Sequence, residues 1–369
     1  ISGRVTGVQT CALPIYLRNY ESAEIEFSPN VNVIVGRNAQ GKTNLVEPIY
    51  IISALKSFRN SKLCDCIKEG ADFSKITVNL DSAFGTKTIE YTINHDGTND
   101  YMVNYNKISK KRDMYGHCYA VIFSPDELKL LKGSPDARRE FLDTDICQIS
   151  NVYSDLLERY DKVLQNRNKL LKFYSNRESI NSELDVWDDS LATLGAQITK
   201  TRENFVANIT HHAEKIMKHL SKNTESLTVK YIGISGENRE EKSQNLLSAL
   251  KTNRNKDREI GYTTVGPHRD EVKFYINDLE VKPYASQGQI RSVVLALKLA
   301  EMEAIKEVKE EPILILDDVF SELDSVRQKL LLEYLQNKQV FITCTNFRKT
   351  DLKNVTKYRI KNAIIKKEN

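Results

Sequence analysis

The sequence predicts an α/β fold in which a helical lobe interrupts a β-sheet domain. Short runs rich in β-branched residues alternate with turns between Leu17 and about Phe123, which favours strands. From about Asp143 to Leu220, apolar residues recur every three and four positions, as they do in amphipathic helices. Strand and helix patterns alternate again from Leu227 onward. This order is typical of one sheet with an inserted lobe of helices.

The first part of the chain contains short predicted strands bounded by Asn, Asp, Gly or Pro. They are Ala23–Phe27, Val31–Val35, Ile76–Leu80, Thr88–Ile93 and Tyr119–Phe123. His95–Asn99 has Asp-Gly at its centre and is predicted to be a turn. The opening segment, Ile1–Tyr16, starts without methionine and lacks the basic and apolar regions of a signal peptide. We interpret it as a non-native leader rather than a targeting peptide. Such a leader would only partly replace an edge strand of the sheet.

The middle of the chain predicts an antiparallel pair of helices separated by a break around Ser175–Ser182. The longer limb would extend roughly 50 Å at 1.5 Å per residue. Trp187 lies on its apolar stripe and is predicted to anchor a core. The predicted domains are an N-terminal head part (17–143), a helical lobe (144–222) and a C-terminal head part (223–369).

The C-terminal head part alternates between strands and helices. The predicted strands are Leu227–Ile232, Val272–Ile276, Ile313–Leu316 and Val340–Thr343. One helix is predicted over Ser286–Val308 and another from Ser325.

Composition excludes several classes of protein. The net charge is only +4, with 54 basic and 50 acidic residues, so a nucleic-acid partner would have to be recognised by local patches. No apolar run approaches the roughly 20 residues that span a bilayer, and no membrane segment is expected. The six cysteines lack paired metal-ligand spacing, which favours reduced thiols and a cytoplasmic protein.

One stretch fits the phosphate-binding pattern G-x-x-x-x-G-K-[ST] between a predicted buried strand and a predicted helix. Its backbone N–H groups would surround the phosphates of ATP. Lys42 would reach the β- and γ-phosphates, and Thr43 would bind Mg²⁺. The predicted ATP-binding residues are Gly36, Arg37, Asn38, Ala39, Gln40, Gly41, Lys42, Thr43 and Asn44.

The apolar strand Ile313–Leu316 ends in two aspartates that would complete this site. Asp317 is predicted to bind Mg²⁺, and Asp318 to orient or deprotonate the attacking water. Lys42 and Asp318 are therefore the predicted catalytic residues. Two aspartates after an apolar run are equally common as a helix cap, so this assignment depends on the P-loop.

A third motif precedes the helix that starts near Ser286. Side chains and N–H groups at a helix N-terminus can bind a second anion, and the alternative is a plain N-cap by Ser286. One P-loop already serves one nucleotide, so a second anion site makes most sense if it completes a site on another subunit. The residues predicted for this contact in trans are Ser286, Gln287, Gly288 and Gln289.

Together with Ser321–Asp324, these motifs resemble the heads of ABC-type ATPases. More closely, the chain resembles the RecF family of bacterial recombination-repair proteins, from Leu17 to about Thr345. The blocks that carry this resemblance are Leu17–Tyr20, Gly41–Glu47, Lys56–Arg59, Phe123–Asp143, Thr263–Glu271, Ser286–Glu301 and Leu316–Asp324.

The resemblance implies an ATP- and Mg²⁺-dependent protein of recombinational repair and replication that binds single-stranded, gapped or double-stranded DNA. It implies a homodimer with two ATP molecules between two heads, in which Ser286 and Gly288 of one subunit face the γ-phosphate held by Lys42 of the other. Asp324 would lie at the dimer interface. RecR and RecA are the partners that the family implies. Asp318 is one methylene shorter than the glutamate common in ABC ATPases, so slow hydrolysis is expected.

The sequence departs from the family pattern at several positions. Ala39 replaces a glycine, which costs roughly 1 kcal/mol if φ must be positive. Pro48 lies inside a predicted helix, where proline costs about 3 kcal/mol. Ile290 stands where the family often has glutamine, and Ile1–Tyr16 does not resemble the family's first strand.

The predicted DNA contacts are basic residues that would bind phosphates. They are Lys56, Arg59, Arg138 and Arg139. Solvated surface charge is the alternative for each, and the two later arginines can equally pair with Glu140 or Asp143. His268 is expected to have a structural or nucleotide-adjacent role.

The alternative function is that of an ABC-type ATPase of another class, either an SMC-like chromosome protein or a transporter ATPase. The first would need a longer coiled coil, and the second would lack the blocks Gly133–Asp143 and Gly266–Glu271.

Overall fold

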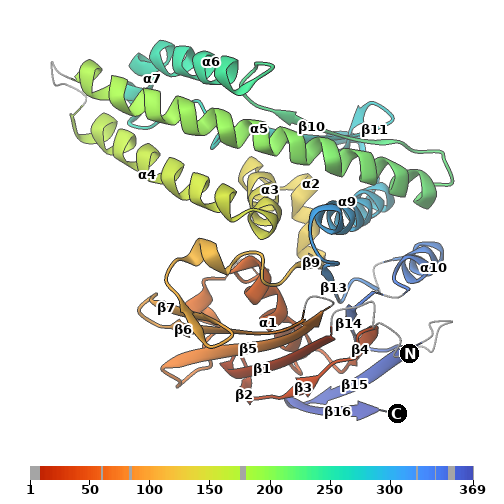
Figure 1. Ribbon diagram of the computed structural model, residues 1–369. Coiled ribbons are helices and arrows are strands. Elements are labelled where there is room, and N and C mark those ends of the chain that lie inside the picture. The colour runs from red at the N-terminus through yellow and green to blue at the C-terminus, as the bar shows by residue number, and fades with distance from the viewer. Residues whose placement is uncertain are drawn as a thin grey trace. The chain divides into compact units, whose positions relative to one another are not determined.

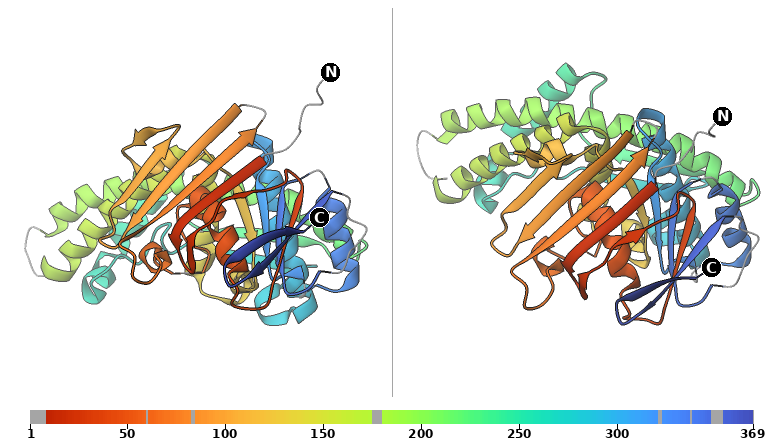
Figure 2. Two further views of the ribbon diagram at one scale, coloured as in Figure 1. Left: turned by 90° about the horizontal axis from the view of Figure 1, so that it is seen from below. Right: turned by 60° about the horizontal axis from the view of Figure 1, so that its bottom comes forward.

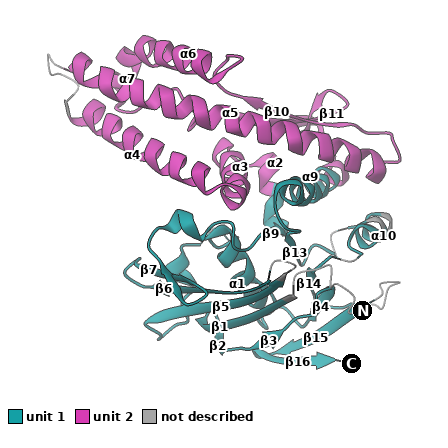
Figure 3. Ribbon diagram, in the orientation of Figure 1, with its two compact units in different colours: residues 1–128, 291–369 teal, residues 129–290 magenta. Residues whose placement is uncertain are grey.

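The computed structural model describes residues 9–59, 61–82, 85–174, 180–320, 323–336, 338–347 and 354–368. The chain divides into two compact units (Figure 3): unit 1 comprises residues 1–128 and 291–369, and unit 2 comprises residues 129–290. Unit 2 includes more of the chain than the helical lobe predicted at 144–222, because a preceding helix and a small sheet pack against the long helices.

The elements are numbered in chain order, and Figure 1 labels most of them. The helices are α1 (Lys42–Ala54), α2 (Lys129–Lys132), α3 (Pro135–Ile149), α4 (Asn151–Tyr174), α5 (Ile180–Leu220), α6 (Arg239–Thr252), α7 (Arg254–Ile260), α8 (Val281–Tyr284), α9 (Gln287–Val308) and α10 (Ser325–Tyr334). The strands are β1 (Gln9–Leu17), β2 (Tyr20–Ser22), β3 (Ile25–Glu26), β4 (Val31–Val35), β5 (Phe73–Ser82), β6 (Gly85–Asn94), β7 (Asn99–Val103), β8 (Asn106–Ile108), β9 (Ala120–Phe123), β10 (Leu227–Ile232), β11 (Glu271–Ile276), β12 (Leu279–Glu280), β13 (Ile313–Asp317), β14 (Val340–Cys344), β15 (Val355–Lys361) and β16 (Ile364–Glu368).

A six-stranded sheet in unit 1 positions the candidate site. Its order is β16-β15-β4-β14-β13-β9, and all neighbours except β15 and β16 pair in parallel. Strands β4, β9, β13 and β14 are buried along their whole length, which explains their continuous apolar sequences. The carboxyl ends of parallel neighbours meet at one edge of the sheet, so the residues after β4, β13 and β14 come together.

A second sheet of unit 1 is antiparallel, with the order β2-β1-β5-β6-β7-β8 and β3 paired to β1. The single sheet expected from the sequence is therefore wrong, because the predicted strands Ala23–Phe27, Ile76–Leu80 and Thr88–Ile93 belong to this second layer. Its longer strands lie side by side in both views of Figure 2.

The N-terminal segment contributes a full strand to this sheet. Gln9–Leu17 forms β1, which pairs with β5 from Gln9↔Asp81 to Ile15↔Lys75. Thr10, Ala12 and Pro14 are buried while the residues between them are not, so one face of the strand packs inward in the usual strand period.

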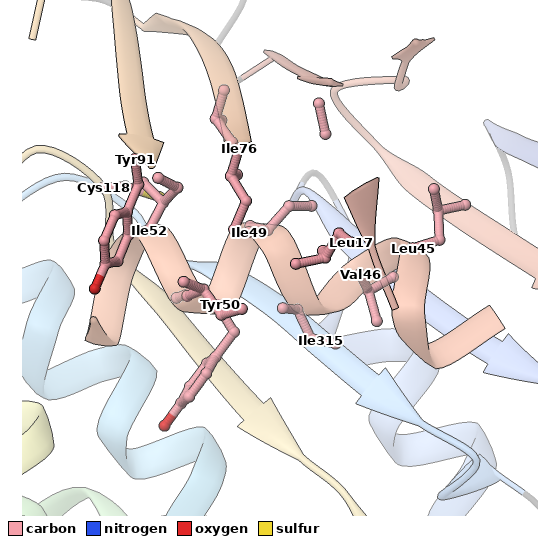
Figure 4. Close-up of a cluster of buried hydrophobic side chains, with 14 of the residues drawn as sticks. Leu17, Leu45, Val46, Ile49, Tyr50, Ile52, Ile76, Tyr91, Cys118 and Ile315 are labelled. Carbon is pink, nitrogen blue, oxygen red and sulfur yellow. The ribbon is translucent and has the colours of Figure 1, made fainter. Parts of the chain in front are cut away.

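Helix α1 packs between the two sheets. Its residues Leu45, Val46, Ile49 and Ile52 belong to one buried cluster with side chains from both layers. Figure 4 shows Ile76 of the antiparallel sheet and Ile315 of the parallel sheet near this helix. The helix continues through Pro48 to Ala54, and nothing in the structure explains the proline.

In unit 2, α4 and α5 pack side by side as the predicted helical hairpin (Figure 1). Helix α5 has 41 residues, which corresponds to about 60 Å at 1.5 Å per residue. Trp187 packs against a small core between the two helices, as predicted. Strands β10, β11 and β12 form a three-stranded sheet in this unit. Within the described ranges, no helix is long and apolar enough to cross a membrane.

Candidate nucleotide-binding site

The loop between β4 and α1 has a backbone shape that encloses a small anion. Ala39 has a φ of 62° and Gly41 a φ of 103°, and turns of this kind point backbone N–H groups into a concavity. A Cβ on Gly36 would lie 2.7 Å from the Ile360 carbonyl oxygen, and one on Gly41 would lie 2.7 Å from Asn19 Nδ2. Both positions therefore require glycine, and Ala39 occupies the strained position that the sequence predicted.

Lys42 directs its ammonium group into this loop. Its Nζ donates hydrogen bonds to the Gly36 carbonyl oxygen at 3.0 Å and, more weakly, to the Arg37 carbonyl oxygen at 3.5 Å. Asp318 Oδ1 lies 3.9 Å from the same nitrogen. The side chain is only 4% exposed, so its charge is held where a phosphate within the loop would meet it.

The P-loop and the strand-end carboxylates are joined directly. The Thr43 hydroxyl donates a 2.8 Å hydrogen bond to Asp317 Oδ1, across 274 residues of sequence. Burial raises the pKa of Asp317, while the Thr343 and Thr43 hydroxyls oppose this rise. A hydroxyl beside a carboxylate is an oxygen donor pair that fits Mg²⁺, which is usually bound by one or two protein oxygens together with phosphates and waters.

Asp318 has the left-handed backbone conformation, with a φ of 53°. Its N–H donates to the Thr343 hydroxyl at 3.0 Å and to the Thr343 carbonyl oxygen at 3.2 Å. Its side chain is 41% exposed. Asp318 thus turns the chain out of β13 and leaves its carboxylate accessible to water next to Lys42.

Asn19, Tyr20 and Asn362, which had no predicted role, hold the loop. The Tyr20 hydroxyl donates to the Gly41 carbonyl oxygen at 3.1 Å, and the Asn44 side-chain amide donates to Asn19 at 2.6 Å. Gln40 accepts a 2.7 Å bond from the Asn362 N–H. Asn19 and Tyr20 were visible in a matching block, whereas Asn362 gives no sequence signal because its contribution is a backbone N–H.

These residues fit a nucleotide with Mg²⁺. The loop offers N–H groups and an ammonium group to phosphates, and Thr43 with Asp317 offers hard oxygen ligands. Among the described residues, no group of three or more His, Cys, Asp or Glu side chains is placed to hold a metal ion by itself. A Mg²⁺ ion on Thr43 and Asp317 would take its remaining ligands from phosphates and water.

The predicted trans contact, Ser286–Gln289, lies at the end of unit 2. Ser286 N–H donates to Gln289 Oε1 at 2.9 Å, and Gln289 N–H donates to the Ser286 hydroxyl at 3.2 Å. This reciprocal pair is a capping box at the start of α9. Ser286 and Gln287 remain exposed, and the Ser286 hydroxyl keeps a proton to donate. Ile290 is only 2% exposed, so an apolar side chain suits that position.

Asp324 begins α10. Its carboxylate accepts a 2.9 Å hydrogen bond from the Arg327 N–H, and Arg327 also forms an ion pair with it. The guanidinium of Arg327 donates to the Ser292 hydroxyl of α9 at 2.8 Å. Asp324 is half exposed, while the neighbouring predicted residues Ser321 and Glu322 lie outside the described residues.

Arg138 and Arg139, two of the predicted DNA contacts, are buried inside unit 2, which corrects that prediction. Arg138 forms two hydrogen bonds with the Glu271 carboxylate at 2.6 and 2.8 Å. Arg139 donates to the Asp270 carbonyl oxygen at 2.7 Å and pairs with Asp136. They are only 4% and 9% exposed, so their charges hold α3 against the 270–271 segment.

Lys56 and Arg59 follow α1 and are half buried. The guanidinium of Arg59 lies 5.9 Å from the ring centre of Phe58. Burial raises the pKa of Asp317, and the positive charge of Arg59 opposes this rise. Lys56 and Arg59 are the DNA-contact candidates that stay partly accessible.

The block Thr263–Glu271 organises the interior of unit 2. His268 Nδ1 lies 2.8 Å from the Tyr160 hydroxyl, and its Nε2 lies 3.1 Å from the Thr263 carbonyl oxygen. Burial lowers the pKa of His268 to about 4. A neutral imidazole whose two ring nitrogens both form hydrogen bonds inside unit 2 has a structural role, which is one of the two roles expected for His268.

Comparison with known proteins agrees with this geometry. The family model described as the RecF/RecN/SMC N-terminal domain matches residues 15–363. The DNA replication and repair protein RecF of Alkaliphilus oremlandii is 42% identical over 336 residues, which cover 90% of this chain and 91% of that protein. RecF of Halalkalibacterium halodurans is 38% identical over 362 residues, which cover 95% and 97%.

Solved structures extend the comparison. A structure described as the recombination mediator protein RecF-ATP in the RecFOR pathway has a TM-score of 0.93 and 33% identity, and the match covers 100% of both chains. An Smc head domain derived from Pyrococcus furiosus has a TM-score of 0.53 at 16% identity, which supports the ABC-type head fold alone.

Proposed function

Because this chain belongs to the RecF family of ABC-type ATPases, we propose that it is an ATP-dependent DNA-binding protein of replication and recombinational repair. The observation that carries the proposal is the 2.8 Å hydrogen bond from Thr43 to Asp317. It joins the P-loop to the strand-end carboxylates, which are the two halves of an ATP and Mg²⁺ site. The names of the RecF relatives support the DNA-repair role.

The residues of unit 1 divide the work of binding and hydrolysing ATP. The P-loop N–H groups and Lys42 hold the phosphates, while Thr43 and Asp317 would hold Mg²⁺, which supplies positive charge to the transferring phosphoryl group. Asp318 orients the attacking water and accepts its proton. Its short side chain and strained backbone make hydrolysis slow in this proposal, so ATP acts as a switch.

The switch that we propose is the closure of a homodimer. The exposed Ser286 and the N-terminus of α9 present donors for the γ-phosphate held by Lys42 of a second subunit, and Asp324 lies at the same interface. ATP closes the dimer on single-stranded, gapped or double-stranded DNA, and hydrolysis opens it. Within this proposal the protein acts in the cytoplasm with RecR and helps to load RecA.

The test is the fluorescence anisotropy of a labelled gapped duplex titrated with protein. The proposal predicts that DNA binds at least about tenfold tighter in ATP–Mg²⁺ than in ADP–Mg²⁺, a difference of about 1.4 kcal/mol. Lys42→Ala removes the ammonium group and should abolish the difference. Lys68→Ala, at a partly exposed residue paired with Glu21, is the matched control and should keep the difference. Equal binding in both nucleotides would refute the DNA switch and favour an ABC-type ATPase of another class.

A further inference from the structure

Strand β14 occupies a special place in the parallel sheet, because it lies between the P-loop strand β4 and the carboxylate strand β13. In the registers of these pairs, Thr343 is the partner of Asp317 on one side and of Ile34 on the other. Thr343 is completely buried. It is therefore the polar side chain of the central strand that stands between the two halves of the candidate site.

The hydroxyl of Thr343 contacts both aspartates. It donates a 2.7 Å hydrogen bond to Asp317 Oδ1, the same oxygen that accepts from Thr43. It also accepts a 3.0 Å hydrogen bond from the Asp318 N–H. Two donors on Asp317 Oδ1 restrict the rotation of the Asp317 carboxylate. The hydrogen bond from the Asp318 N–H holds the left-handed turn from which the Asp318 carboxylate projects.

We propose that Thr343 is a positioning residue for ATP hydrolysis, which fixes the orientation of the Asp317 carboxylate and the backbone turn at Asp318. This inference rests on the proposed function and adds a residue to its site. One hydroxyl thereby couples the Mg²⁺ ligand to the residue that orients water. Thr343 is completely buried, and it acts through the two aspartates.

A buried threonine can also be a merely structural group, and the chain contains a matched example. Thr10 in β1 is completely buried, and its hydroxyl donates a 2.7 Å bond to the Gln339 side chain. Thr10 has no bond to either aspartate. Thr10→Val and Thr343→Val therefore remove the same kind of group from the same unit, and only the second removes it from the site.

The experiment compares wild type, Thr343→Val, Thr343→Ser and Thr10→Val in the full chain. Three quantities are measured: the thermal unfolding midpoint, the Mg²⁺ concentration that half-saturates ATPγS binding, and the single-turnover rate of ATP hydrolysis. Valine keeps the shape of threonine without its hydroxyl, and serine keeps the hydroxyl.

We expect Thr343→Val to slow hydrolysis at least about tenfold, which corresponds to 1.4 kcal/mol, and to raise the half-saturating Mg²⁺ concentration severalfold. Thr343→Ser should stay within threefold of wild type in both. Thr10→Val should lower the unfolding midpoint without changing either quantity. A wild-type rate in Thr343→Val, or equal impairment of the serine variant, would overturn the inference alone. A wild-type protein that fails to bind ATPγS would overturn the proposed function and this inference with it.

Discussion

At the scale of single residues, the site is held in backbone conformations that L-residues adopt at a cost. Ala39 and Asp318 both have positive φ, at 62° and 53°. Aspartate tolerates this region because its short polar side chain bonds locally, whereas alanine has no such compensation. Ala39 therefore carries strain that a glycine at this position would relieve.

Replacing Ala39 with glycine should therefore stabilise the protein. Alanine in the left-handed region costs about 1–2 kcal/mol. Removing this strain is offset by about 0.5–1 kcal/mol, because glycine gives the unfolded chain more conformational freedom. The expected net gain in the free energy of unfolding is about 0.5–1 kcal/mol, measured by urea denaturation.

The matched control is Ala207→Gly on the exposed face of α5. Glycine in a helix interior should lower the free energy of unfolding by about 1 kcal/mol. The same substitution thus has opposite signs at the two positions. Destabilisation by Ala39→Gly would show that the loop does not strain alanine.

His268 makes stability depend on pH. Its pKa is lowered by burial from 6.5 to about 4, so the unfolded chain binds a proton that the folded protein excludes. Stability from this group is complete above the unfolded pKa and is lost as the pH falls from about 6.5 towards 4. Between pH 7.5 and pH 5.0, this loss should amount to about 2 kcal/mol.

His268→Gln tests this dependence, because glutamine does not titrate and has one donor and one acceptor for the same partners. We expect the free energy of unfolding of the variant to fall by about 2 kcal/mol less than that of wild type over this pH interval. Parallel pH profiles for the two proteins would mean that folding does not lower the pKa of His268.

At the scale of elements, α1 is held by a buried ion pair as well as by its apolar faces. Arg18 donates to both carboxylate oxygens of Glu47 on α1, at 2.9 and 2.7 Å. Glu47 is completely buried and also accepts a 2.6 Å bond from Ser57. This network joins the end of β1 to the helix that carries Lys42 and Thr43.

Glu47→Gln should destabilise the fold by about 3 kcal/mol, because the charge of Arg18 would lose its buried partner. Urea denaturation measures the change. Glu21→Gln removes the partner of Lys68 in an exposed pair and should change the free energy of unfolding by less than about 0.5 kcal/mol. Similar effects of the two variants would show that the buried pair does not anchor α1.

Local pattern predicted most elements but not their partners. Val31–Val35, Ile313–Leu316 and Val340–Thr343 are strands as predicted, because buried parallel strands give continuous apolar runs. Their division between two sheets depends on pairings far apart in sequence, which periodicity does not encode. Helix α6 was missed because its exposed face is polar and its fully buried apolar residues are only Leu246 and Leu250.

The candidate site was predictable where residue type and spacing carry the chemistry. Thr43 and Asp317 meet as expected. Thr343 gives no signal, because a single threonine at the end of an apolar strand is ordinary until the register places it opposite Asp317. Arg138 and Arg139 were predicted to contact DNA because two adjacent arginines resemble a basic surface patch. Their partners, Glu271 and the Asp270 carbonyl group, are 133 and 131 residues away and cannot be identified from the local sequence.

At the scale of the whole molecule, the proposed function requires two copies of the chain. Unit 1 carries the P-loop and carboxylates, whereas the exposed Ser286 and Gln287 belong to unit 2. The central claim is that ATP joins the two sets across a dimer and that Asp318 ends this state by activating water. Asn suits the left-handed backbone at this position, so Asp318→Asn removes the carboxylate without disturbing the turn.

The most direct test is sedimentation velocity of the Asp318→Asn protein in ATP–Mg²⁺ and in ADP–Mg²⁺. The account predicts that the Asp318→Asn protein is a persistent dimer in ATP–Mg²⁺ and a monomer in ADP–Mg²⁺. The double variant Asp318→Asn, Lys42→Ala should be a monomer in both. Wild type should form the dimer and lose it as ATP is consumed. A monomer in ATP–Mg²⁺, or a dimer that is the same in both nucleotides, would contradict the nucleotide switch.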